Sequence, residues 1–429
     1  MFKALNRLSL TQIAITLVVS AMTIRLFSLG FFPLMDTTEA RYGEMARIMA
    51  ETGNWITPMF DYNVPFWGKP PLFTWMSASG INLFGLNEFA VRLPHLIAGG
   101  LVLFIVGLLA YSIIPSRTTS ERKQEAWLAT GILATTTTFI VVTGAVMTDT
   151  ALTLGITLSM TSFWLNYKNK SKLWGHLFFI GLTVGMLAKG PLALVLIGMS
   201  LFLWALFNKT WMGMFRSLPW KTGIPLFLVT SLPWYIIAEY SSPGFLNYFI
   251  IGEHIKRFLV SGWQGDLYGT AHKEMKGTIW IFAILSALPW TPIFIYQWIK
   301  NLQVTKKTKA ESQTQQDDDT TELNYTSFLW AWLLAPLLLF TFSGNILSSY
   351  VMPCLPAFAL LMVTYQRNNP LSSKVYKTGL ITPVLILIVA ILLRTELTGK
   401  QSEKGLMQPW TQHAQHSELI YIDKRPFSA

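Results

Sequence analysis

Long runs of apolar residues recur along the whole chain, and they constrain its fold more than any other feature. Ile13–Phe32, Leu96–Ile114 and Ile279–Ile299 are three examples. A helix needs about 20 mostly apolar residues to cross the hydrocarbon core of a bilayer. Only 13% of the 429 residues are charged, whereas soluble domains carry about a quarter. The sequence therefore predicts an all-α protein that crosses a membrane many times.

About eleven spans are expected. The first is too long for the core of a signal peptide, and no small-residue cleavage site follows it, so we expect it to be retained. Arg25 lies near its middle, and the sequence offers no reason for a charge there. The expected spans are 10–34, 91–114, 126–146, 149–167, 173–188, 192–207, 222–238, 277–299, 326–344, 347–365 and 378–394.

The net charge of +11 is distributed so that it indicates orientation rather than nucleic-acid binding. Lys and Arg residues follow the second, fourth, sixth, eighth and tenth spans, and positive loops remain in the cytoplasm. The cytoplasmic loops then include 300–325, whereas 35–90 and 239–276 lie on the outer side. Residues 1–394 are expected to form one transmembrane domain, and 395–429 a short outer tail, either natural or truncated.

The first outer segment, 35–90, is expected to contain an amphipathic helix. Over Asp36–Glu51, the residues Tyr42, Met45 and Met49 fall on one helical face. Gly53 is a suitable residue to end the helix. Such a helix would lie in the membrane interface instead of crossing the bilayer.

Two acidic residues at the start of this helix allow two interpretations. Asp36 and Glu39 could form a capping pair, with Asp36 at the N-cap and Glu39 three residues later. Alternatively, one of them is a catalytic acid or base, because a carboxylate near low-dielectric surroundings can have a raised pKa. Both interpretations can hold together.

Lys69 lies farther along this segment and is followed by two prolines that stiffen the chain. A cation held rigidly at the membrane surface suits a phosphate headgroup. Alternatively, Lys69 only extends its charge to the interface from an apolar environment.

An ordered set of short motifs now identifies a family resemblance. They are Glu39-Ala40-Arg41-Tyr42, Gly53-Asn54-Trp55, Lys69-Pro70-Pro71 and Asn87-Glu88-Phe89-Ala90. The pattern resembles the lipid-linked-sugar glycosyltransferases of the dolichyl-phosphate-mannose protein mannosyltransferase superfamily, which have the GT-C fold. Within it, the chain is most similar to the bacterial aminoarabinose transferases that modify lipid A.

The resemblance implies a reaction, its partners and a location. A hexose or pentose would pass, with inversion, from polyprenyl phosphate, expected to be undecaprenyl phosphate, to an envelope acceptor. That acceptor would be a lipid A-like glycolipid, a glycan or a protein. The site would face the periplasm from a bacterial inner membrane.

The resemblance also suggests roles for individual residues. Lys69, Arg41, Lys189, His254 and Arg257 are candidates to bind the donor phosphate. Asp149 is expected to be a second active-site carboxylate beside Asp36 or Glu39, and Tyr42 and Tyr350 to contact substrate. Four of these residues also have a structural interpretation. Asp149 could cap a helix, Gly190 after Lys189 breaks one, and His254 could be structural, with Arg257 pairing with Glu253.

Two departures from the family pattern affect the chemistry. Where members carry an aspartate directly before Glu39, this chain has Thr38, so Asp36 is the first choice for the base and Glu39 the second. Where members often carry a glutamate before the Lys-Pro pair, this chain has Gly68. That change removes a carboxylate ligand and weakens the case for a divalent metal, although a metal is not ruled out.

Two other functions stay open on the sequence alone. A transporter or flippase would need charged residues at mid-membrane depth and discontinuous helices. A non-catalytic protein could instead only bind lipid-linked sugars.

Overall fold

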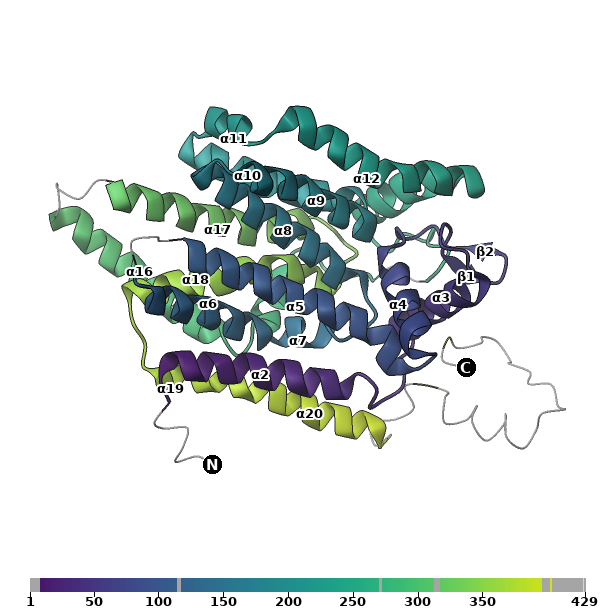
Figure 1. The fold of residues 1–429 in the computed structure, drawn as a ribbon, viewed down its shortest axis with the longest axis horizontal. Coiled ribbons are helices and arrows are strands. Elements are labelled where there is room, and N and C mark those ends of the chain that lie inside the picture. Colours follow the sequence, from purple (N-terminus) through teal and green to yellow (C-terminus); the bar gives the residue numbers. More distant parts are fainter. Residues whose placement is uncertain are drawn as a thin grey trace.

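A computed structural model of the protein describes residues 8–113, 117–269, 272–311 and 317–395, together with residues 402 and 427. Most of these residues lie in helices that form one elongated bundle (Figure 1). Most of the expected tail 395–429 lies outside the described residues.

The first half of the chain contains nine helices and one small hairpin in its described parts. They are α2 (Leu10–Ser28), α3 (Thr38–Thr52), β1 (Met59–Asp61), β2 (Val64–Pro65), α4 (Leu72–Phe84), α5 (Glu88–Ser112), α6 (Thr119–Ala134), α7 (Thr137–Val142), α8 (Thr148–Asn169), α9 (Lys172–Lys189) and α10 (Pro191–Asn208).

The second half adds further α-helices and short π and 3-10 helices. They are α11 (Trp211–Ser217), α12 (Trp220–Ser241), α13 (Phe245–Asn247), the π-helix η1 (Tyr248–Lys256), α14 (Arg257–Leu259), α15 (Thr278–Ser286), α16 (Thr291–Glu311), α17 (Asp317–Thr341), η2 (Ser348–Cys354), α18 (Leu355–Asn368), α19 (Ser373–Tyr376), η3 (Lys377–Leu380) and α20 (Ile381–Arg394).

Seven helical stretches of the described chain are long and apolar enough to cross a membrane, or eight if one bent pair is counted as a span. The count of eleven therefore stays a prediction. Helices α8 and α9 fall outside the seven. For α8, the composition explains why, because this helix is rich in Thr and Ser and is buried among other helices. A helix that is surrounded by other helices does not face lipid, so it does not need an apolar surface.

Two of the expected spans are interrupted in the structure. The span 277–299 bends by 100° between α15 and α16, where Pro289 and Pro292 lack the backbone N–H that a helix needs. The span 126–146 breaks between α6 and α7. There, the hydroxyls of Thr135 and Thr136 bond the carbonyls of Gly131 and Leu133, which competes with continued helical bonding.

The centre of the bundle depends on close helix approach. A Cβ atom on Gly155 of α8 would lie 2.5 Å from the backbone nitrogen of Gly185 in α9. Small residues at such positions allow two backbones to approach closely, which substitutes for hydrophobic association inside a membrane. The close fit fixes the start of α8 relative to the end of α9, where two candidate site residues lie.

The predicted amphipathic helix is present as α3, and its apolar face is buried within the protein at Tyr42, Met45 and Met49. Gly53 ends it with a left-handed φ of 67°. The capping prediction was wrong, because Thr37 occupies the N-cap and makes no side-chain cap bond. Glu39 instead pairs with a buried arginine, as described below.

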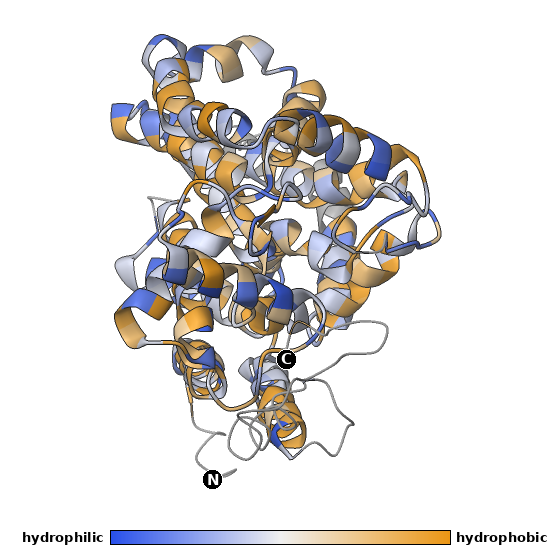
Figure 2. Ribbon diagram, turned by 90° about the vertical axis from the view of Figure 1, so that its right-hand side faces the viewer, coloured by the Kyte–Doolittle hydropathy of each residue, from blue (hydrophilic) through white to orange (hydrophobic). Residues whose placement is uncertain are grey.

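The two ends of the bundle differ. Helices α3 and α4 and the hairpin cover one end of the bundle. The last residues of α16 and the first residues of α17 lie at the opposite end (Figure 1). Figure 2 looks onto the end that carries α3 and shows hydrophilic residues there among hydrophobic helices. This separation agrees with the expected placement of 35–90 and 300–325 on opposite sides of the membrane.

Arg25, unexplained by the sequence, bonds to groups inside the bundle through its two terminal guanidinium nitrogens. Its guanidinium donates to the Ser28 hydroxyl at 2.9 Å and to the Val141 carbonyl at 3.0 Å. The charge therefore joins α2 to α7 inside the bundle.

Candidate active site

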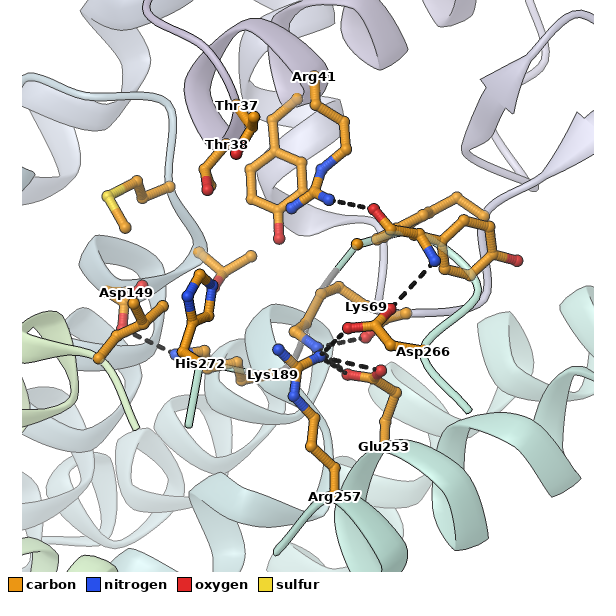
Figure 3. A pocket seen from close by; sticks show the side chains of 18 of the residues that line it. Thr37, Thr38, Arg41, Lys69, Asp149, Lys189, Glu253, Arg257, Asp266 and His272 are labelled. Atoms are coloured by element: carbon orange, nitrogen blue, oxygen red, sulfur yellow. Dashed lines mark hydrogen bonds and ion pairs between the residues drawn. The ribbon is translucent and has the colours of Figure 1, made fainter. Parts of the chain in front are cut away.

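A cavity at the α3 end of the bundle gathers charged side chains from distant parts of the chain (Figure 3). We call it the central cavity. Its walls come from the start of α3, the loop before α4, the start of α8, the end of α9, η1, α14, residues 266–269 and 272, and the start of η2. Its charged and polar side chains belong to Thr37, Thr38, Arg41, Tyr42, Lys69, Thr148, Asp149, Lys189, Glu253, Arg257, Asp266, Tyr268, His272 and Tyr350.

Glu253 organises two of the cavity's cations. One of its carboxylate oxygens lies 2.6 Å from Lys69 Nζ and 3.1 Å from Arg257 Nη1. Arg257 also contacts Asp266 at 3.1 Å. Burial alone would raise the pKa of Glu253, but Lys69 and Arg257 outweigh it and hold this pKa below its usual 4.5. The predicted pairing of Glu253 with Arg257 is confirmed.

Asp149 and Lys189 form a second buried ion pair, with 2.7 Å between Oδ1 and Nζ. Asp149 lies in the first turn of α8 and Lys189 in the last turn of α9. These are the helix ends where the peptide dipoles favour an acid and a cation, respectively. Lys189 Nζ also lies 4.3 Å from the centre of the Tyr350 ring, a cation–π distance.

Arg41 and Tyr42 form the α3 wall of the cavity. Arg41 donates a hydrogen bond to the carbonyl of Tyr268, and its guanidinium lies 5.2 Å from the Tyr42 ring. Tyr42 packs against Phe66 and Phe73. Burial raises the pKa of the Tyr42 hydroxyl, so this group stays neutral and can donate a hydrogen bond.

His254 lies next to the central cavity and not in it. It lines an adjoining cavity together with Lys69, Lys189 and Arg257. Its Nδ1 lies 2.8 Å from the Phe249 carbonyl and its Nε2 lies 3.1 Å from the Lys189 carbonyl. Burial lowers the pKa of His254. The contact of Nε2 with the Lys189 carbonyl joins η1 to the end of α9, which is a positioning role.

Asp36 and Glu39 are placed away from the other candidates. Both line a separate side cavity that includes Arg25, and neither lines the central cavity. The carboxylate of Glu39 accepts two bonds from Arg92, at 2.8 and 2.7 Å. Burial opposes its ionisation, but Arg92 keeps the pKa of Glu39 below the usual 4.5. Thr38, the residue at the family's aspartate position, faces both cavities.

The structure therefore brings together Arg41, Tyr42, Lys69, Asp149, Lys189, Arg257 and Tyr350, with His254 alongside. The sequence reasoning missed Asp266, Tyr268 and His272. All three come from the region after α14, where residues 261–269 and 272 form neither a helix nor a strand. Acidic and histidine side chains in an outer loop were the one available signal. No three His, Cys, Asp or Glu side chains of the described chain cluster in a way that could hold a metal ion.

Residues 11–249, more than half of the chain, match the model of the dolichyl-phosphate-mannose-protein mannosyltransferase family. The chain belongs to this family. The motifs around Glu39 and Lys69 had indicated this family, and the match confirms it.

Similar proteins narrow the relationship within the family. The undecaprenyl phosphate-alpha-4-amino-4-deoxy-L-arabinose arabinosyl transferase of Enterobacter sp. (strain 638) is 27% identical over 82% of this chain and 59% of its own length. A protein of the same name from Pseudomonas fluorescens (strain Pf0-1), numbered 2, is 28% identical over 79% of this chain and 56% of its own length. The chain thus spans little more than half the length of these relatives.

The fold has a solved counterpart. The crystal structure of ArnT from Cupriavidus metallidurans bound to undecaprenyl phosphate superposes with a TM-score of 0.68. The match has 22% identity and covers 89% of this chain and 64% of that one. The expected GT-C membrane fold is therefore confirmed for this member of the mannosyltransferase family.

Proposed function

We propose that this protein transfers a sugar from a polyprenyl-phosphate donor to an envelope acceptor, on the periplasmic side of a bacterial inner membrane. The observation that carries the proposal is the central cavity, where Lys69, Arg257 and Lys189 come together at one end of a membrane bundle. The names of the relatives and the ligand of ArnT support undecaprenyl phosphate as the carrier lipid. A long lipid carrier requires a site at the end of the bundle, where lipid and water meet.

The donor phosphate would sit between Lys69 and Arg257. Both cations are held by the buried Glu253 carboxylate, so their positions are set before the donor arrives. When the bond between the sugar and the phosphate breaks, negative charge builds on the leaving phosphate. Fixed cations stabilise that charge without further rearrangement.

The Asp149–Lys189 pair would orient the sugar and the attacking acceptor. The Lys189 ammonium donates a hydrogen bond to Asp149 and lies over the Tyr350 ring, so its position is fixed. Tyr42 and Arg41 would contact the sugar from the opposite wall. Displacement by an acceptor from the face opposite the phosphate inverts the anomeric carbon. Glu39 would not contact the substrate, because both of its carboxylate oxygens bind Arg92. It would contribute by holding α3 in position.

The test is transfer by purified protein in lipid vesicles. Radiolabelled undecaprenyl-phosphate sugar and an envelope extract serve as donor and acceptors. We expect label transfer by the wild type and a loss of at least about 100-fold in Lys69→Met, since removing one fixed charge donor costs 10²–10³ in rate. Lys273→Met is the matched control, because Lys273 is exposed in the same outer region and does not line the central cavity.

Other results would contradict the proposal. Donor binding without any transfer by the wild type would indicate a binding protein. Appearance of the donor in the opposite leaflet, without transfer, would indicate a transporter.

A further inference from the structure

The central cavity contains three carboxylates, and each is already paired with a cation. Asp149 pairs with Lys189, Glu253 with Lys69 and Arg257, and Asp266 with Arg257. A carboxylate stabilised in this way is a weak proton acceptor, because pairing favours its ionised form. If an acceptor hydroxyl attacks the sugar, its proton needs another destination.

His272 lines this cavity from the segment that precedes α15. Among the described residues, its imidazole makes no hydrogen bond or ion pair, whereas its backbone is firmly held. The His272 carbonyl accepts from Ile346 N at 3.1 Å. One residue on, Lys273 forms a β-bridge with Asn345. Figure 3 shows the imidazole extending into the cavity toward the side where Thr37 and Thr38 lie.

The surroundings of His272 favour its neutral form. Partial burial lowers its pKa from the usual 6.5, and the nearby charges of Arg257 and Arg41 lower it further. Asp266 and Glu274 act in the opposite direction without reversing the shift. A neutral imidazole has one nitrogen with a free lone pair, which can accept a proton near pH 7. The other titratable groups around the cavity are Lys69, Asp149, Lys189, Glu253, Tyr42, Tyr268 and Tyr350.

We propose that His272 is the general base of the transfer and that the acceptor therefore attacks through a hydroxyl group. The inference rests on the proposed glycosyl transfer. The acceptor oxygen forms the new bond to the anomeric carbon while its proton moves to the imidazole nitrogen. The bond from that carbon to the phosphate oxygen breaks, and its electron pair leaves with the polyprenyl phosphate. The imidazolium then returns the proton to water.

Thr38 lines the same cavity but cannot serve as the base. A threonine hydroxyl at this cavity-facing position cannot take up a proton near neutral pH, whereas an aspartate could. His272 supplies a proton acceptor to the same cavity from a different loop.

The experiment compares the wild type, His272→Gln and Lys273→Gln in the vesicle assay. We expect His272→Gln to lower kcat by about 100-fold or more, within the range for losing a general base, while donor binding changes less than twofold. The wild-type rate should fall on acidification below pH 6.5, and the residual rate of His272→Gln should not. Lys273→Gln should resemble the wild type in both.

Two results would overturn the inference. If the wild type transfers sugar and His272→Gln keeps kcat within threefold with the same pH profile, the base is elsewhere or the acceptor group is already ionised. If the wild type transfers nothing, the proposed function itself fails. Thermal unfolding of His272→Gln verifies that a lost rate does not reflect a lost fold.

Discussion

At the scale of single residues, buried carboxylates in this protein hold cations in place. Glu253 and Glu39 illustrate two outcomes of this arrangement. Glu253 faces the central cavity and positions Lys69 and Arg257 there. Glu39 is enclosed by Arg92, which has no exposed surface. The first pair prepares a binding site, and the second fixes the position of a helix.

Glu253→Gln should reveal the first role. We expect the variant to lose about 1–3 kcal/mol of stability, because two partly solvated cations lose their charged partner. The folded-state pKa of Glu253 lies below 4.5, so its ionised form stabilises the protein above pH 4.5. That contribution disappears as the pH falls through the folded-state pKa.

Melting temperatures measured in detergent as a function of pH provide the readout. Below pH 4.5 the wild type should lose stability more steeply than Glu253→Gln. Parallel curves would show that folding does not lower the pKa of Glu253.

Arg92→Lys should reveal the second role. The guanidinium binds Glu39 through two nitrogens and also donates to the carbonyls of Leu29, Phe32 and Pro33. A lysine ammonium cannot reproduce this geometry, and we expect a loss of about 2–4 kcal/mol.

Arg47→Lys is the control. Arg47 lies in α3, the helix that carries Glu39, and pairs with Glu44 and Glu51 on the more exposed side of that helix. Its effect should stay below about 1 kcal/mol. Equal shifts in melting temperature for the two variants would show that burial of the Glu39–Arg92 pair has no special weight.

At the scale of elements, the turn between α9 and α10 supports both halves of the site. Lys189 ends α9, and Gly190 follows with a φ of +69°. A Cβ atom on Gly190 would lie 2.5 Å from the ring of Phe249, and 3.3 Å from the His254 ring. The missing side chain therefore lets η1 approach the end of α9, which brings Glu253 within reach of Lys69.

Gly190→Ala should displace η1. We expect a loss of about 1–3 kcal/mol from the positive φ and the clash with a buried ring, together with weaker donor binding. Gly198→Ala in α10 is the matched control, because no atom lies within 4 Å of its added Cβ and its backbone is helical. If both variants bind the donor like the wild type, the missing side chain of Gly190 is not what positions η1.

At the scale of the whole molecule, the structure predicts which groups are accessible from each side of the membrane. Cys354 is the single cysteine of the chain and is buried, so new cysteines can be labelled in a Cys354→Ser background. Met275→Cys lies in the outer segment 239–276, and Leu173→Cys lies at the end of α9 farthest from Lys189. Both native side chains are exposed.

In intact cells whose outer membrane has been permeabilised, a membrane-impermeant maleimide should label Met275→Cys and not Leu173→Cys. Broken membranes should expose both sites. Labelling in the reverse order would place the central cavity on the cytoplasmic side and would contradict the proposed function.

Much of the architecture was predictable from local patterns. The apolar runs predicted the membrane bundle, and the spacing of Tyr42, Met45 and Met49 predicted α3 and its buried face. These features depend on neighbours in sequence, where helix periodicity and the thickness of a bilayer apply directly. The motifs around Glu39 and Lys69 also identified the family.

The partners of the charged residues were decided by the tertiary structure. The sequence left a capping and a catalytic role open for Glu39, and the structure pairs it with Arg92. Glu253 binds Lys69, which lies far away in the sequence. His272 reaches the central cavity from a loop without periodicity. The sequence by itself determined that the chain enters the membrane many times and which short segments carry charge outside it. Only the packing of the bundle decided which of those charges meet, because a buried ion pair requires two distant backbones to lie at one specific separation.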